Sequence, residues 1–158
     1  LFSYVNERLG GLWASITGNG QIDHSSYIRK EYRRVGMEQF FKTPILGIGI
    51  GCSSFISSLV EGRQTYLHNN FVELLACGGI VGFTLFYSMY LFLAAKLYKF
   101  RRYMQNQTWL CLILMFLMIV MDYGMVSYYS KGTYFFLMVF FIQYQNAKKS
   151  ISNRNVYS

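Results

Sequence analysis

Acidic residues are scarce in this chain of 158 residues. Seven Asp and Glu stand against fifteen Lys and Arg, and all charged residues together make up only 14%. Soluble domains carry roughly 25%. Hydrophobic residues reach 53% and aromatic residues 19%, with 14 Tyr and 14 Phe. This balance argues against an ordinary soluble domain and is typical of a membrane protein.

Cysteine is also rare. Cys52, Cys77 and Cys111 lack metal-ligand spacing, and two of them lie inside apolar runs, so neither a metal site nor a disulfide framework is expected. The net charge of +8 could indicate nucleic acid, but the basic residues flank apolar runs instead of lining one soluble face. We therefore expect a membrane as partner, no nucleic acid, no metal and no cofactor.

The first residues carry no visible targeting signal. Residues 1–20 lack a basic start followed by an apolar run, so they do not resemble a signal peptide. The chain begins at Leu1 without an initiating Met. We therefore expect it to be the C-terminal part of a longer protein.

The single proline, Pro44, follows a predicted helix. Residues 27–43 carry apolar side chains at helical spacing, which predicts an amphipathic helix that ends before the proline. On it, Arg29 and Arg33 are spaced i,i+4, and neither has an acid three or four residues away. A bound anion would offset their repulsion, although an ordinary solvated basic face would look the same. Residues 44–55 form a glycine-rich loop whose backbone can lie against another segment.

Three apolar runs follow and predict three transmembrane helices, at about 71–95, 108–128 and 133–147. The short segments after the first and third runs contain bases and no acids, which predicts that both lie on the cytoplasmic side. An odd number of crossings then places the other end of the first run outside the cell.

The expected fold class is therefore all-α. The chain is expected to be a fragment of an integral membrane helical protein, with a large extracytoplasmic loop containing an amphipathic helix, followed by three transmembrane segments. The expected division is residues 1–67 as the extracytoplasmic loop region, 68–147 as the membrane region and 148–158 as a cytoplasmic tail.

A polar cluster leads directly into the first apolar run. His68, Asn69 and Asn70 stand before a segment that opens with Glu73. A His and two amides where water and lipid meet suit a reaction on a lipid-linked polar substrate. Alternatively, His68 only hydrogen-bonds the loop and caps the following helix, and Asn69 is as good an N-cap as a sugar contact. An unpaired acid in a membrane helix is costly, so an arginine, Arg29 or Arg33, is the expected partner of Glu73.

The spacing here resembles the bacterial O-antigen ligase and O-antigen polymerase superfamily. That family's pattern is His, then Asn, Ser or Gln, nine residues, Gly, two residues, and Gly or another small residue. His68, Asn69, Gly79 and Gly82 match it. The three glycines of the Gly78-Gly79-x-x-Gly82 step are expected to permit close helix packing.

Upstream residues extend the resemblance. The family shows an Arg opening a helix, about fifteen residues before a Pro-x-x-Gly-x-Gly loop that ends in an aromatic residue. Those places are taken by Arg29, Pro44, Gly47, Gly49 and Phe55. The resemblance covers about residues 25–95, and beyond them it rests on hydropathy alone.

The resemblance implies a metal-independent, inverting membrane glycosyltransferase in the bacterial cytoplasmic (inner) membrane, multi-pass, with its catalytic loop facing outside. The donor would be a polyprenyl-pyrophosphate-linked oligosaccharide and the acceptor a hydroxyl of a glycolipid. We expect a polymerase of capsule, exopolysaccharide or O-antigen repeat units, with other polysaccharide-assembly proteins as candidate partners. The fragment alone is expected to be inactive. An O-antigen-type ligase, a transporter or flippase for lipid-linked sugars, and a non-catalytic membrane subunit remain alternatives.

The same resemblance implies roles for single residues. Arg29 would stabilise the leaving pyrophosphate, and His68 would position the acceptor hydroxyl or take its proton. The substrate-binding candidates are Arg33, Arg63, Asn69 and Tyr66. The residues expected to give structural support are Glu73, Gly79 and Gly82. Asp122, near the end of the second apolar run, is expected to be either functional or exposed at the membrane interface.

Overall fold

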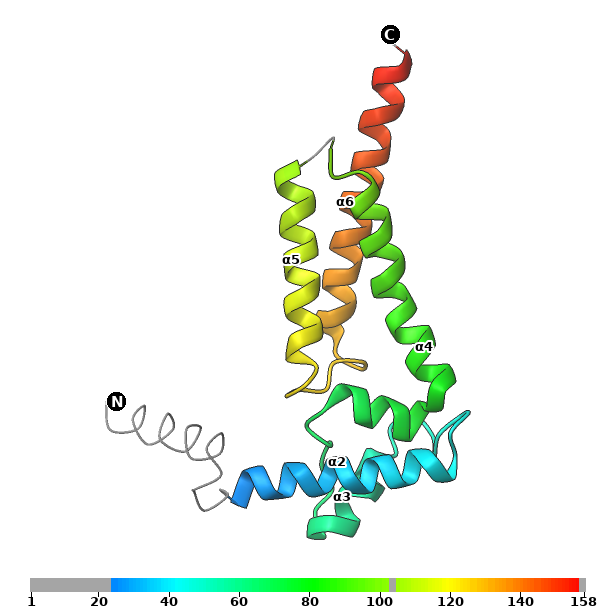
Figure 1. Cartoon of the computed structure of the whole chain (residues 1–158), viewed down its shortest axis with the longest axis vertical. Coiled ribbons are helices and arrows are strands. Elements are labelled where there is room, and N and C mark those ends of the chain that lie inside the picture. Colours follow the sequence, from blue (N-terminus) through cyan, green and yellow to red (C-terminus); the bar gives the residue numbers. More distant parts are fainter. Residues whose placement is uncertain (1–23, 103–104, 157–158) are drawn as a thin grey trace, which may run out of the picture.

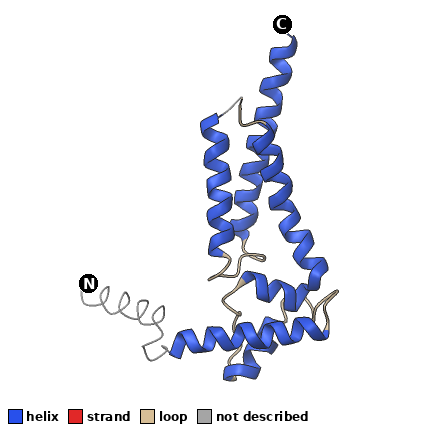
Figure 2. Cartoon of the chain, in the orientation of Figure 1, coloured by secondary structure: helices blue, strands red, loops and turns tan. Residues whose placement is uncertain are grey.

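The computed structural model describes residues 24–102 and 105–156, which form helices joined by loops (Figure 1). The helices are α2 (His24–Lys42), α3 (Ser53–Glu61), α4 (Asn70–Lys99), α5 (Gln105–Met121) and α6 (Lys131–Val156). No strand occurs within these ranges (Figure 2), so the predicted all-α class is confirmed for them. The predicted helix 27–43 corresponds to α2, while residues 1–23 of the predicted loop region lie outside the described residues.

The helices form a bundle with a platform at one end. In Figure 1, α5, α6 and most of α4 run side by side, whereas α2 lies across the lower end of this bundle with α3 beyond it. The bundle has its own apolar core, made by Leu93, Met115 and Phe140 among others. A second core, between α2, α3 and the start of α4, contains Tyr32, Ile56, Leu67 and Ala76.

Helix α4 is broken at Gly79, whose backbone has φ 62° and ψ −166°. Its first segment, residues 70–78, lies beside α2, and the chain then turns into the bundle (Figure 1). The predicted span 71–95 lies within α4, and the structure adds an interruption at Gly79. The part after the break, Ile80 to Lys99, is about 30 Å long at 1.5 Å per residue, which matches the hydrocarbon core of a bilayer.

The loop that follows α2 repairs this break. A helix interrupted in its middle leaves carbonyl and N–H groups without intrahelical partners, and these must bond elsewhere when buried. Four backbone hydrogen bonds to the loop satisfy them. The pairs, donor N–H first, are Ile48 to Ala76 (2.9 Å), Gly49 to Cys77 (2.9 Å), Ile80 to Pro44 (2.8 Å) and Val81 to Ile45 (3.2 Å).

Two glycines make this close approach possible. A Cβ on Gly47 would lie 2.4 Å from the carbonyl carbon of Cys77, and one on Gly79 would lie 2.3 Å from the carbonyl oxygen of Ile45. A Cβ on Gly82 would be 3.9 Å from its nearest neighbour, an ordinary contact. The expected helix-to-helix packing at the glycine step is therefore replaced by a loop packed against the break, and Gly82 has no close contact there.

The other two predicted spans also differ from the helices observed. Helix α5 ends at Met121 instead of 128, and α6 continues beyond the predicted end at 147. Within the described ranges, α4 is the one helix that is long and apolar enough to cross a membrane, and Asn106–Met121 is a shorter apolar helix.

Candidate functional site

His68 lies where α2 meets the start of α4, at the end of the bundle. Its ring stacks on Tyr32 of α2, with ring centroids 6.3 Å apart and planes at 10°. On another side, the ring of Tyr66 approaches to 4.2 Å. His68 is half-buried, while Tyr66 is exposed. Two aromatic rings therefore hold the imidazole and leave part of it open.

The backbone of His68 is in the left-handed region, with φ 54°. Among the described residues other than glycine, it alone has a positive φ. Such a conformation is costly for most side chains and is often found at functional sites. Glycine or asparagine would adopt this backbone conformation more easily, so a histidine at this position costs some stability.

Asn69, and not His68, caps helix α4. Its side-chain Oδ1 accepts the N–H of Val72 at 3.0 Å, and its Nδ2 donates to the carbonyl of Tyr123 at 3.1 Å. The interpretation of Asn69 as an N-cap is confirmed, and the alternative in which His68 caps the helix is wrong. Since Asn69 is buried and both ends of its amide are bonded within the protein, it is better placed to support the loop than to contact a sugar.

Burial and a nearby positive charge favour the neutral imidazole. Burial lowers the pKa of His68, the Arg29 guanidinium lowers it further, and the Glu61 carboxylate opposes them. The ordinary pKa of histidine is about 6.5, so a lowered pKa favours the neutral form of His68 at pH 7. A neutral imidazole can accept a proton.

Tyr32 is supported from behind by α3. Its hydroxyl donates to Glu61 Oε2 at 2.6 Å, and its ring is 1% exposed. Burial, followed by this hydrogen bond, raises the pKa of Tyr32 to about 12, while the charge of Arg63 acts in the opposite direction. The exposed Arg63 therefore lies near Tyr32, beside the site.

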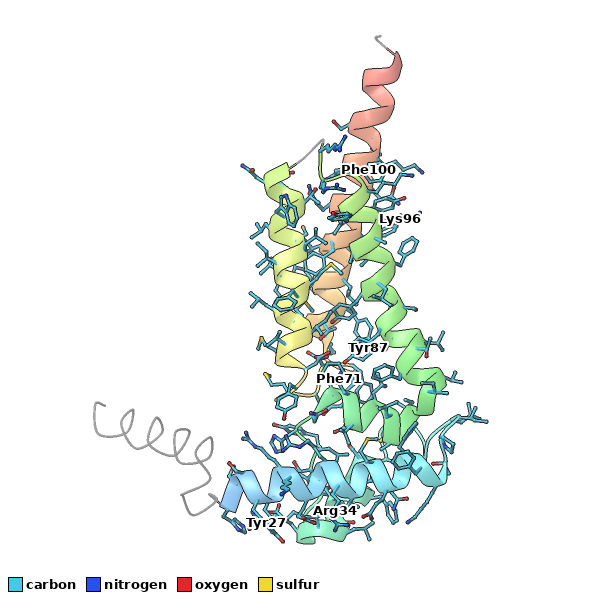
Figure 3. All side chains as sticks on the ribbon, viewed as in Figure 1. Tyr27, Arg34, Phe71, Tyr87, Lys96 and Phe100 are labelled. Carbon is cyan, nitrogen blue, oxygen red and sulfur yellow. The ribbon has the colours of Figure 1, made fainter. Side chains whose placement is uncertain are left out.

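The two predicted arginines of α2 lie on the face of that helix that is turned toward the site. Arg29 acts electrostatically on His68, and Arg33, one turn later, contacts Tyr123. Within residues 24–102 and 105–156, neither forms a salt bridge with an acid. Arg34, by contrast, points away from the bundle (Figure 3) and pairs with Glu31 and Glu38.

Glu73 is fully buried, but the prediction that Arg29 or Arg33 is its partner is wrong. Glu73 Oε2 accepts the N–H of Leu67 at 2.7 Å, and Oε1 lies 3.4 Å from the hydroxyl of Tyr128. The break at Gly79 turns the first segment of α4 so that this carboxylate faces the backbone beneath His68. Glu73 thus holds the loop that carries the histidine.

A buried network joins the start of α4 to the loop between α5 and α6. Asn70 Oδ1 accepts the N–H groups of Ser127 (2.8 Å) and Tyr128 (3.0 Å), and its backbone N–H donates to the carbonyl of Asp122 at 2.8 Å. The side chain of Asp122 accepts from Ser127 and from Tyr87, which is labelled in Figure 3. Asp122 is 1% exposed, so the expected interfacial exposure is wrong.

The site therefore combines a neutral imidazole with guanidinium groups that have no described acid partner, and Tyr123 is the member that the sequence did not reveal. Guanidinium groups bind phosphate oxygens with forked, charged donors, and an imidazole exchanges protons near neutral pH. Comparison of the chain with protein-family models, curated proteins and solved structures finds no match in any of the three.

Proposed function

We propose that this chain carries the catalytic region of a bacterial membrane glycosyltransferase of the O-antigen ligase and polymerase type. It transfers a polyprenyl-pyrophosphate-linked glycan to a hydroxyl of an acceptor glycolipid, and in doing so polymerises polysaccharide repeat units. The observation that carries this proposal is the convergence of His68, Arg29 and Arg33 at one end of the bundle.

The chemistry needs two kinds of group. The bond between the anomeric carbon and the pyrophosphate oxygen breaks, and the negative charge that develops on the leaving pyrophosphate requires stabilisation by Arg29 and Arg33. A new bond forms from the acceptor oxygen to the opposite face of that carbon, which inverts it. The acceptor proton passes to the neutral imidazole of His68.

Several features support a multi-pass location with the site outside the cell. Lys96 and Phe100 lie at the end of α4 far from α2 (Figure 3), with Lys99 between them in the chain and two arginines directly after them. Basic residues at that end favour a cytoplasmic position for it, which leaves α2 outside. Helices α5 and α6 also expose large apolar side chains, which suits contact with lipid. These include Leu110, Ile113, Phe116, Phe135 and Met138.

The proposal is tested by Arg29→Ala and His68→Ala in the whole protein in its bacterial host. We expect each variant to lose long surface polysaccharide chains while still inserting normally into the membrane, as measured by chain-length distribution and membrane fractionation. Lys30→Ala is the matched control, because Lys30 is an exposed base adjacent to Arg29. Polymer that is made but never attached to its final acceptor would indicate the ligase alternative, and unchanged polysaccharide in both variants would remove the catalytic interpretation.

Removing Arg29 should also shift the titration of His68. The guanidinium lowers the pKa of the imidazole, so Arg29→Ala is expected to raise it. Because neutral His68 accepts the proton, activity should rise with pH through this pKa. Because the pKa of His68 is lower in the folded than in the unfolded state, His68 stabilises the fold above about pH 6.5. This contribution should be lost as the pH falls from about 6.5 through the folded-state pKa. The imidazole resonance, followed by NMR against pH, checks the direction, with Lys30→Ala expected to leave a smaller shift. If the pKa of His68 falls or stays constant in Arg29→Ala, Arg29 does not act electrostatically on His68 as described.

A further inference from the structure

Tyr123 lies in the loop between α5 and α6, and its side chain is 63% exposed, although its neighbour Asp122 is only 1% exposed. An exposed aromatic residue next to a buried acid has a fixed backbone and a ring that lies at the surface. The tip is directed to α2, where it meets Arg33.

The backbone at Tyr123 is fixed from two sides. Its carbonyl accepts Asn69 Nδ2 at 3.1 Å, and the preceding carbonyl, of Asp122, accepts the N–H of Asn70 at 2.8 Å. Both donors belong to the polar cluster that follows His68. The position of Tyr123 is therefore set by the same short segment that sets the position of the histidine.

The contact with Arg33 holds its guanidinium without neutralising it. Arg33 Cζ lies 5.5 Å from the centroid of the Tyr123 ring, and Arg33 Nη1 lies 3.5 Å from the hydroxyl oxygen. This is the geometry of a cation–π interaction. A carboxylate would hold the arginine more strongly but would also cancel the charge that an incoming anion needs.

We propose that Tyr123 is a positioning residue that holds the Arg33 guanidinium for the pyrophosphate of the donor lipid. The inference rests on the proposed function, because it takes its anion from there. Tyr123 thereby links three separate parts of the chain: the arginine face of α2, the polar cluster before α4 and the loop after α5.

The test measures binding of undecaprenyl pyrophosphate, without sugar, to the whole protein in lipid nanodiscs. Tyr123→Ala is expected to weaken binding roughly tenfold. Arg33→Ala should weaken it further, and the double variant should bind no more weakly than Arg33→Ala, because Tyr123 acts through Arg33. Tyr98→Ala is the matched control, since Tyr98 lies against Arg101, with the guanidinium 3.9 Å from its ring, in the opposite part of α4. It should bind like the unchanged protein.

Different results would contradict the role of Tyr123 and the proposed function. Unchanged binding in Tyr123→Ala, or a loss that adds fully to that of Arg33→Ala, overturns the role of Tyr123 alone. If the unchanged protein does not bind the probe, the proposed function fails and the inference fails with it. Should Tyr123→Ala not fold, Tyr123→Leu replaces it, because leucine keeps apolar volume but offers neither a ring nor a hydroxyl. Tyr123→Leu must then weaken binding of the probe, and its combination with Arg33→Ala must bind no more weakly than Arg33→Ala alone.

Discussion

Replacing Gly79 with alanine is expected to lower the free energy of unfolding by more than about 3 kcal/mol. The backbone there, at φ 62° and ψ −166°, lies in a region that residues with a Cβ rarely adopt. The added Cβ would also lie 2.3 Å from the carbonyl oxygen of Ile45. That atom is backbone and is held by its own hydrogen bond to Val81, so it cannot move away cheaply.

Two other glycines separate the causes of this loss. Gly51 has φ 83° with nothing within 4 Å of an added Cβ, so Gly51→Ala should cost only the conformational penalty, about 1–2 kcal/mol. Gly82→Ala has neither problem and should be close to neutral. Thermal unfolding of the three variants of the whole protein in detergent gives the comparison. If Gly79→Ala unfolds at the same temperature as Gly82→Ala, the loop does not hold the broken helix as described.

Replacing His68 with asparagine is expected to reduce glycosyl transfer at least about 100-fold while leaving the unfolding temperature nearly unchanged. Asparagine tolerates a positive φ better than most residues, so the backbone at φ 54° would be relieved by this change. That gain offsets the lost stacking on Tyr32 and Tyr66. Asparagine cannot accept a proton near neutral pH, so the proposed proton transfer would be lost.

The control for this substitution is His24→Asn. The side chain of His24 is 84% exposed and lies 4.0 Å from Glu61, a contact of little energetic weight at the surface. It should retain normal transfer and stability. A His68→Asn variant that transfers normally would show that the imidazole is there only for packing, whereas one that unfolds would show that the aromatic contacts outweigh the backbone cost.

The residue pattern was sufficient to predict what depends on neighbouring residues. Helix α2, its end before Pro44 and the cap at Asn69 follow from local spacing and chemistry, and all three are present in the structure. The break in α4 could not be predicted in this way. Residues 74–95 contain no charged residue, so hydropathy does not distinguish a straight helix from one interrupted at Gly79. The break is stable only because a loop some thirty residues earlier supplies the missing hydrogen bonds.

Long-range partners explain the other errors at the site. Glu73 was expected to need an arginine, yet a backbone N–H satisfies it at far smaller cost than a second buried charge. Asp122 carried a usable signal, since an acid at the end of an apolar run needs partners. Those partners, Asn70 and Tyr87, are distant in sequence and only the fold brings them near. Tyr123 gave no signal in a chain with 14 tyrosines.

The loop that repairs the break in α4 is also the direct continuation of the helix that bears Arg29 and Arg33. Two of its backbone hydrogen bonds hold Ile80 and Val81, so a tilt of the segment from Ile80 to Lys99 would be transmitted through them to α2. Helices tilt to match the thickness of the surrounding lipid. For the proposed membrane enzyme, the distance between the guanidinium groups and the imidazole would therefore depend on lipid composition, and the affinity for the pyrophosphate would change with it.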